Sequence, residues 1–293
     1  MKNNVLYNAG GNMRDLTNKN VIHVKKDGIE YLQFKKLLEY SDIISHAYSL
    51  GIDKSYRTGR KCTINPLLDE ERNKALKDYE DLCTAIGTDH INLMKPNQAH
   101  TNKVISVNKK INKDKPDFNL DDYNLTDGAV TNKKNIILAT TNADCIILLF
   151  FDPVKRVIAN VHSGWKGTLK RISVEAVRKM KEEYGCNPKN IICCICPSIR
   201  ECHFEVRKDV QEPYYNEFKE LEEIDKIIVP IPGEEKWYID TVKINKLILK
   251  QEGLKEENII DSEICSVCNS DLVHSYRVEK AGFGVSTAII ELK

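Results

Sequence analysis

Residues 136–168, IILATTNADCIILLFFDPVKRVIANVHSGWKGT, hold the densest combination of apolar runs and reactive side chains in the sequence. Short runs rich in β-branched and aromatic residues occur at 136–140, 146–151 and 156–161. Such runs are typical of buried strands, and Asp152 followed by Pro153 predicts a turn between the second and the third. A helix is expected to begin near Thr168. The stretch therefore predicts three strands that lead into a helix.

Polar corners follow the first and the third of these runs. Their chemically interesting residues are Asn142, Asp144, Cys145, His162, Ser163 and Lys166. A thiol and an imidazole are thus expected at the ends of buried strands. Strand ends leave side chains free to meet a ligand, so Cys145 and His162 are candidates for a functional site.

Strands and helices alternate irregularly along the rest of the chain. We expect strands at residues 21–24, 31–34, 43–49, 91–94, 104–107, 191–197, 227–230, 259–265 and 285–290. Helical spacing of apolar residues predicts helices at 69–86, 168–184, 212–221 and 241–251, with Pro213 in the first turn of the third helix. Residues 108–124 read as a charged surface loop. This order favours an α+β fold with mixed β-sheets over a regular doubly wound sheet.

Composition narrows the class of protein. The chain has 44 basic and 43 acidic side chains and a formal charge of +1, so no global field attracts nucleic acid or a membrane surface. A small metabolite is the more natural partner. Residues 1–20 are polar and expected to be poorly ordered, and residues 21–293 are expected to form one domain. We find neither a signal peptide nor an apolar run of about 18 residues, which predicts a cytoplasmic protein.

The sequence has ten cysteines, an unusually high number. Without a secretion signal we do not expect disulfides, and Cys193, Cys194 and Cys196 read as small apolar residues of a core strand. Cys265 and Cys268 form one C-x-x-C motif. A structural zinc site would need a second pair of ligands, and none is recognisable in the sequence, so a purely structural role is favoured for this motif.

Two of the seven histidines, His100 and His162, lie at strand ends beside small or polar residues, as Cys145 does. One cysteine and two histidines would give zinc three protein ligands and leave a fourth position for water, which is typical of catalytic zinc. A cysteine nucleophile paired with histidine, or no site at all, is equally compatible with the spacing.

The turn that begins at His162 also has two interpretations. Gly164 and Gly167 can simply permit a tight turn in which Trp165 anchors the packing. Alternatively, backbone N–H groups at the start of the helix bind an anion. The side-chain candidates for binding phosphate are Ser163, Lys166, Arg200 and Arg277.

Five motifs in order resemble one known family. They are Gln98-Ala99-His100, Thr141-x-Ala143-Asp144-Cys145, His162-Ser163-Gly164-Trp165-Lys166-Gly167, Cys196-Pro197-Ser198-Ile199 with Phe204-Glu205-Val206, and Cys265 with Ser275-Tyr276-Arg277. Together they resemble the laccase-domain family, whose members were long called multicopper polyphenol oxidoreductases and are now described as purine nucleoside phosphorylases. The resemblance extends from about His46 to the end of the sequence.

The resemblance implies a fold, a metal and an activity. It implies an α/β/β/α arrangement, and a Zn²⁺ ion held by His100, Cys145 and His162, which would form the catalytic centre. The implied reaction is phosphorolysis of adenosine, inosine, guanosine or methylthioadenosine, with adenosine deamination as a second activity. Purine nucleoside and phosphate are then the partners, and His46 joins the candidates for contacting them. A monomer or a small homo-oligomer is expected.

The sequence departs from the family pattern where arginines are usual. Near His46 it reads Ser49-Leu50-Gly51 instead of a segment with arginine, and Lys166 and Phe283 replace two more arginines. Lysine cannot reproduce the bidentate grip of arginine on phosphate. The alternatives are therefore a degenerate member that binds nucleosides without turnover, or a copper-dependent polyphenol oxidase.

Overall fold

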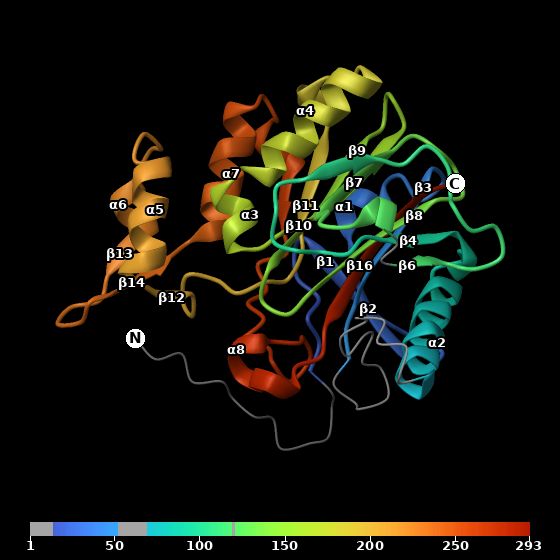
Figure 1. The fold of residues 1–293 in the computed structure, drawn as a ribbon, viewed down its shortest axis with the longest axis horizontal. Helices are drawn as coiled ribbons and strands as arrows, with labels where there is room; N and C mark the ends of the chain where they lie inside the picture. Colours follow the sequence, from blue (N-terminus) through green and yellow to red (C-terminus); the bar gives the residue numbers. More distant parts are fainter. Residues whose placement is uncertain (1–13, 52–68, 119–120) are drawn as a thin grey trace.

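The computed structural model describes residues 14–51, 69–118 and 121–293. Two large mixed β-sheets pack face to face, and helices cover the outer face of each sheet (Figure 1). The expected α/β/β/α arrangement is confirmed. No helix in the described residues is long and apolar enough to span a membrane.

The first large sheet carries helix α2 (Asp69–Ala85) on its outer face. In spatial order its strands are β1 (Val21–Lys26), β2 (Ile29–Phe34), β3 (Ile44–Ser49), β16 (Ser286–Leu292), β8 (Ile137–Asn142), β4 (Leu93–Lys95) and β6 (Asp117–Phe118). Strand β4 is parallel to β8 and β6, whereas the other pairs are antiparallel. A short helix, α1 (Lys35–Leu38), follows β2.

The second large sheet is covered by helices α4 (Ile172–Tyr184) and α7 (Thr241–Gln251). Its strands, in spatial order, are β15 (Ile259–Asp261), β11 (Ile192–Ile195), β9 (Ile146–Asp152), β10 (Val157–Ser163), β7 (Gly128–Thr131) and β5 (Val104–Ser106). A small third sheet beside it contains β12 (Glu205–Arg207), β14 (Lys236–Ile239) and β13 (Ile228–Pro230), packed with α5 (Lys208–Phe218) and α6 (Ile224–Ile227).

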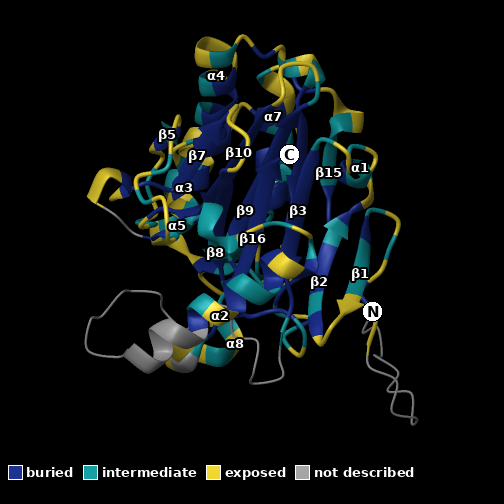
Figure 2. Ribbon diagram, turned by 90° about the vertical axis from the view of Figure 1, so that its right-hand side faces the viewer, coloured by how far each residue is buried: buried dark blue, intermediate teal, exposed yellow. Residues whose placement is uncertain are grey.

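Strand β9 is buried on both faces, which explains its continuous apolar sequence. Ile147, Leu149 and Phe151 face the first sheet, and the alternate residues, including Leu148 and Phe150, face α4 and α7. Burying each such side chain contributes about 1.5–3 kcal/mol relative to exposure. Residues 146–151 therefore lie at the centre of the molecule, where Figure 2 shows β9 among the buried strands.

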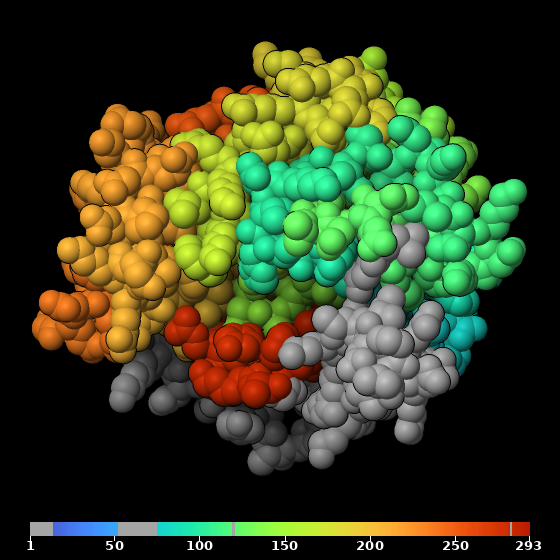
Figure 3. Space-filling model, viewed as in Figure 1, coloured from blue at the N-terminus to red at the C-terminus, as the bar shows by residue number. Residues whose placement is uncertain are grey.

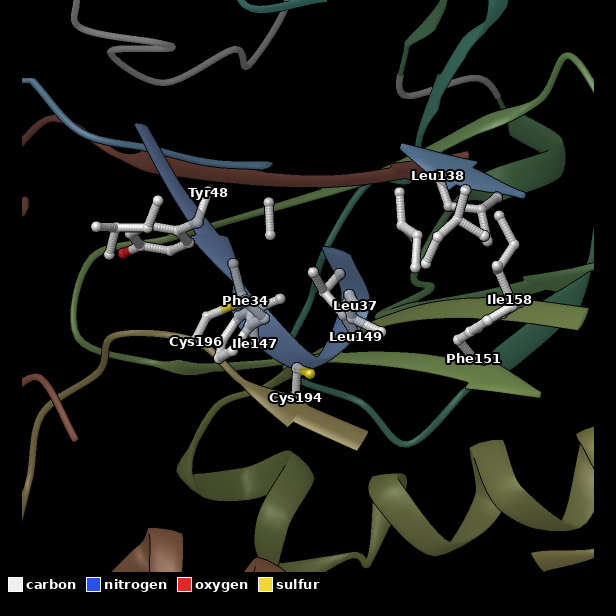
Figure 4. Close-up of a cluster of buried hydrophobic side chains, with 14 of the residues drawn as sticks. Phe34, Leu37, Tyr48, Leu138, Ile147, Leu149, Phe151, Ile158, Cys194 and Cys196 are labelled. Carbon is white, nitrogen blue, oxygen red and sulfur yellow. The ribbon is translucent and has the colours of Figure 1, made fainter. Parts of the chain in front are cut away.

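The core between the two sheets contains residues from β2, β3, β8, β9, β10 and β11 (Figure 4). One polar side chain, Asn160 in β10, crosses this core. Its amide donates hydrogen bonds to the carbonyl oxygens of Leu138 (3.0 Å) and Ala288 (2.8 Å), and its side-chain oxygen accepts one from the Thr140 hydroxyl. A buried amide satisfied in this way fixes the register of one sheet against the other.

Three predictions about local structure are wrong. The expected helix at residues 168–184 is two helices, α3 (Trp165–Leu169) and α4, because Arg171 adopts a left-handed backbone with φ of 57°. Helix α5 begins at Lys208, so Pro213 lies inside the helix and not in its first turn. The charged segment 108–124 is not simply a loop, because it contains β6. Strands β7, β12 and β14 were not predicted.

The remaining differences are small. The helix at 241–251 has the predicted bounds, and the helix predicted at 69–86 ends one residue earlier. The expected strands are present with boundaries shifted by a few residues, although β15 ends at Asp261 and not near residue 265. The expectation for residues 1–13 lies outside the described part of the chain. In residues 14–20, the Asn18 and Asn20 side chains donate hydrogen bonds to the carbonyl oxygens of Ser262 (2.8 Å) and Asp261 (2.7 Å).

Candidate active site

His100, Cys145 and His162 form a compact group that we call the pocket cluster. His100 follows β4, Cys145 lies between β8 and β9, and His162 lies in β10. Their potential ligand atoms are all within 4.8 Å of one another, and the Cys145 Sγ is 3.8 Å from the His100 Nε2. The two imidazole rings are nearly perpendicular, with centroids 5.0 Å apart. Three segments far apart in the sequence thus bring their donor atoms to one point.

Asp127, a fully buried carboxylate, holds both histidines of the pocket cluster. Its Oδ1 accepts hydrogen bonds from the His162 Nδ1 (2.8 Å) and from the main-chain N–H of His100 (3.0 Å). Its Oδ2 accepts from the N–H and the hydroxyl of Thr101, each at 2.7 Å. The bond to Nδ1 leaves Nε2 of His162 for a metal, which is the usual way a carboxylate orients a metal-binding histidine.

Cys145, His162 and Asp127 shift one another's pKa values. Burial alone would raise the pKa of the Cys145 thiol, but the adjacent His162 charge and hydrogen bonds from both histidines lower it below its usual value. Burial alone would lower the pKa of His162, whereas Cys145 and Asp127 raise it. The hydrogen bond and charge of His162 also lower the pKa of Asp127 to about 2, against the effect of burial. The thiolate, the form that binds metals, is therefore favoured.

The backbone at the pocket cluster is constrained. His100 and Asp144 have positive φ angles, 59° and 84°. The Asp127 carboxylate accepts hydrogen bonds from the N–H groups of Ala99, His100 and Thr101, and these bonds stabilise the left-handed backbone of His100. A β-carbon at Gly164 would lie 2.7 Å from the His100 Cδ2 and 3.1 Å from the Cys145 Sγ. Glycine at 164 is therefore required for the close approach of this turn to both ligands.

Further hydrogen bonds tie together the loops that carry the ligands. The Gln98 side chain donates to the Thr141 carbonyl and accepts from the Thr141 N–H, both at 2.8 Å. Asp144, next to Cys145, accepts from the Ser266 hydroxyl and from the main-chain N–H of Arg277, both at 2.6 Å. These contacts position Cys145 from two directions.

The pocket cluster opens into a cavity of about 700 Å³. Aromatic side chains from separate segments line it, and we call them the aromatic wall: Trp165, Phe204, Tyr276 and Phe283. Charged side chains of both signs also line it, namely Arg207, Arg277, Asp144, Glu205 and Asp209. Figure 3 shows a hollow at this place, bordered by the C-terminal segment in red, α3 in yellow-green and the segment near residue 100 in teal. The cavity can enclose a small molecule with an aromatic and an anionic part.

The donor set fits a catalytic zinc ion. One thiolate and two imidazoles are zinc ligands of the usual kinds, and three protein ligands leave a fourth position for water or substrate. The same donors also suit copper. All three residues line the cavity, so a metal ion held by them would be accessible to a molecule bound there.

The structure brings only part of the predicted set together. Ser163 and Arg277 line the cavity, although the Ser163 hydroxyl is buried and within 2.9 Å of the Thr168 hydroxyl. Lys166 is exposed over the Trp165 ring, 5.3 Å from its centroid. The other two candidates, His46 and Arg200, lie outside the cavity lining, as Lys166 does.

These two, His46 and Arg200, have other partners. The buried His46 accepts a hydrogen bond at its Nε2 from the Phe34 N–H (2.8 Å) within the first sheet. Arg200 forms a bidentate pair with Asp261, at 2.7 and 2.9 Å. Of the candidates Arg277, Lys166, His46 and Arg200, Arg277 is the one that lines the cavity.

Asp127 and Arg207 were not singled out from the sequence, and the aromatic residues were noted there for other reasons than lining a cavity. An acidic residue before a strand is common in turns, so Asp127 carries no local signal of its role. Tyr276 lies inside a motif that was recognised, next to Arg277, but its place in the cavity depends on how distant segments pack.

Comparison with known proteins supports the same fold and family. The family model described as "Multi-copper polyphenol oxidoreductase laccase" matches residues 56–293. Purine nucleoside phosphorylase YlmD of Bacillus subtilis is 31% identical over 219 residues, 74% of this chain and 77% of that protein. Adenosine deaminase RL5, from an unknown prokaryotic organism, is 28% identical over 196 residues, 67% and 73% of the two chains.

A solved structure shares the architecture. The protein YfiH of Bacillus licheniformis superposes with a TM-score of 0.76 at 23% identity, covering 90% of this chain and 96% of that one. Such a likeness establishes the fold. With the family model matching 56–293, the chain belongs to the multi-copper polyphenol oxidoreductase laccase family, also called the laccase-domain family.

Proposed function

We propose that the protein is a zinc-dependent purine nucleoside phosphorylase that acts on adenosine, inosine, guanosine or methylthioadenosine. The observation that carries this proposal is the convergence of His100, Cys145 and His162 on a cavity with an aromatic wall and an arginine. The name of the Bacillus subtilis relative supports the same reaction.

His100, Cys145 and His162 would hold the zinc ion, with Asp127 fixing the orientation of His162. When bound, zinc supplies Lewis acidity that can activate water or polarise the purine. The chain's own contribution is a site whose ligands are in place before substrate arrives, because Asp127 and Gly164 constrain them.

The aromatic wall suits a purine base. Trp165, Phe204, Tyr276 and Phe283 line the cavity, and the rings of Tyr276 and Phe283 lie edge to face with centroids 5.1 Å apart. Stacking a base on an aromatic side chain is worth about 1–3 kcal/mol and tolerates different bases. This tolerance is consistent with a range of purine nucleosides.

Arg277 is the proposed contact for phosphate. Its Nη2 donates to the Glu205 carbonyl oxygen (3.2 Å), which positions the guanidinium at the cavity. Guanidinium groups bind phosphate strongly through charge-assisted hydrogen bonds. In phosphorolysis the N-glycosidic bond breaks with its electrons passing to the purine, while a phosphate oxygen forms a new bond to C1′. A phosphate held beside the sugar also stabilises the positive charge that develops there.

Adenosine deamination is the second candidate activity. The relative named adenosine deaminase RL5 motivates it, as does the open position beside three metal ligands. Deamination replaces the C6 amino group by an oxygen from water and needs no phosphate.

The test is to incubate zinc-loaded protein with adenosine, with and without phosphate, and to separate adenine, inosine and hypoxanthine by chromatography. Adenine release that depends on phosphate and is lost in Cys145→Ala supports the phosphorylase. Cys186→Ala is the matched control, because Cys186 is a buried cysteine away from the cavity lining. Inosine formed without phosphate identifies deamination, and binding of adenosine without any product would contradict both activities.

Copper-dependent oxidation of phenols is the rival that the family's older description suggests. Among the described residues, the pocket cluster supplies three donors for one ion, whereas a multicopper oxidase needs many more histidines. We expect no oxygen uptake with a phenol from metal-analysed protein. Robust, copper-dependent uptake would contradict the proposed function.

A further inference from the structure

A second group of metal-binding side chains lies outside the pocket cluster. Cys202, His203, Cys265 and Cys268 have ligand atoms within 4.8 Å of one another, and we call them the loop cluster. The expectation that the C-x-x-C motif lacks a second pair of ligands is wrong, because Cys202 and His203 supply that pair. The segment after β11 and the segment after β15 meet here.

The ligand atoms of the loop cluster lie 3.1–3.8 Å apart in the pairs described below. The Cys202 Sγ lies 3.6 Å from the Cys265 Sγ and 3.8 Å from the Cys268 Sγ. The His203 Nδ1 lies 3.1 Å from the Cys202 Sγ, 3.7 Å from the Cys265 Sγ and 3.5 Å from the Cys268 Sγ. The single nitrogen therefore faces all three sulfur atoms.

Most of these separations match the edges of a tetrahedron of ligands around zinc. With Zn–S bonds of about 2.3 Å and Zn–N bonds of about 2.0–2.1 Å, tetrahedral angles require S···S edges of about 3.8 Å and S···N edges of about 3.6 Å. The two S···S separations from Cys202 agree within 0.2 Å, and two of the three S···N separations agree as closely. The third, from the His203 Nδ1 to the Cys202 Sγ, is shorter, at 3.1 Å. A disulfide is a poorer description, because it would need sulfur atoms about 2.05 Å apart.

We propose that the loop cluster binds a second zinc ion with all four protein ligands, as a structural Cys₃His site. Three cysteines and one histidine leave no position open for water or substrate, which is typical of structural and not catalytic zinc. Thiolates brought this close repel one another, and a divalent cation removes that repulsion.

Zinc in the loop cluster would fix one wall of the cavity. The N–H of Ser266, between Cys265 and Cys268, donates to the Ser198 carbonyl (3.0 Å), and the Ser198 N–H donates to Ile264 (3.3 Å). The Ser266 hydroxyl reaches Asp144 beside Cys145. On the other segment, His203 directly precedes Phe204 of the aromatic wall. The second zinc would thus join the two segments that support the pocket cluster.

The test is the metal content of the purified, reduced protein. Wild type is expected to hold two zinc ions per chain, one for each cluster, and Cys268→Ala and Cys145→Ala are expected to hold one each. Cys268→Ala with the same zinc content as wild type would overturn the proposal, and so would a wild type whose only zinc is lost in Cys145→Ala. Metal content does not depend on turnover, so an inactive protein would still show the second zinc if the proposal holds.

Cobalt substitution of the wild type provides a second readout that does not require a variant to fold. Two Co²⁺ ions per chain are expected, one of them with the intense charge-transfer absorption of several thiolates in a tetrahedral site. Absorption from one thiolate only would contradict the Cys₃His assignment. A Cys202–Cys265 or Cys202–Cys268 disulfide in freshly purified protein, found by peptide mapping without reduction, would contradict it too.

Discussion

The pocket cluster and the loop cluster use the same two kinds of donor but differ in how many they present. The pocket cluster has one cysteine and two histidines and lines a cavity. The loop cluster has three cysteines and one histidine, enough to surround zinc completely. Ligand number and access, more than ligand type, distinguish a catalytic zinc site from a structural one.

The clusters also differ in what supports them. A buried carboxylate, Asp127, and a glycine without room for a β-carbon, Gly164, hold the pocket cluster in place. The loop cluster instead joins two chain segments and, through Ser266, supports Asp144. Changes at the first are therefore expected to affect chemistry, and changes at the second mainly stability.

The largest effect is expected from removing one ligand of each cluster. Cys145→Ala should reduce phosphorolysis by more than about 100-fold, because loss of a supporting residue alone can cost that much. Cys268→Ala should retain more activity at low temperature but melt at a lower temperature. Steady-state kinetics and thermal unfolding of both variants check this. Equal loss of activity in the two, with equal melting temperatures, would erase the distinction between the clusters.

A smaller effect is expected from Asp127→Asn. The substitution preserves shape but removes the charge that holds the His162 Nδ1. We expect zinc affinity or activity to fall about 10–100-fold. Competition with a chromophoric chelator measures the affinity, and thermal unfolding of the metal-free protein serves as the control for folding. Unchanged zinc affinity would show that Asp127 does not orient the ligand.

Gly164→Ala should weaken zinc binding at the pocket cluster and leave the loop cluster occupied. Its β-carbon would contact the His100 ring at 2.7 Å, so the ring must move. Gly233→Ala is the control, since a β-carbon there meets no atom of the described residues within 4 Å, although its φ of 81° carries strain. Zinc stoichiometry of the two variants checks the prediction. Full occupancy in Gly164→Ala would mean that the ligands adjust freely.

The smallest effect is expected from Ser266→Ala. The Ser266 hydroxyl links the two clusters by its hydrogen bond to Asp144. Removing its hydroxyl leaves the Asp144 Oδ1 without that 2.6 Å hydrogen bond and should cost about 1–3 kcal/mol of unfolding free energy. Ser262→Ala is the matched control, because that buried hydroxyl has no hydrogen-bond partner among the residues that the structure describes. Denaturant unfolding measures both. Equal stability of the two variants would show that the link through Ser266 is weak.

Short-range patterns predicted the centre of the fold, whereas contacts between distant segments were harder to predict. The apolar runs that form β8, β9 and β10 can be read from the sequence, because each run is continuous along the chain. Cys145 and His162 were predicted as site residues because they lie at the ends of such runs. Cys202 and Cys265 are 63 positions apart, and no spacing rule pairs them. The break at Arg171 depends on a single backbone angle that residue type does not require.

The most direct test of the account is anomalous diffraction at the zinc absorption edge from crystals of the reduced wild-type protein. We predict two peaks, one among His100, Cys145 and His162 with its fourth position toward the cavity, and one enclosed by the loop cluster. The absence of a peak at the pocket cluster, in protein that is active on adenosine, would contradict the central claim that its chemistry depends on zinc held there.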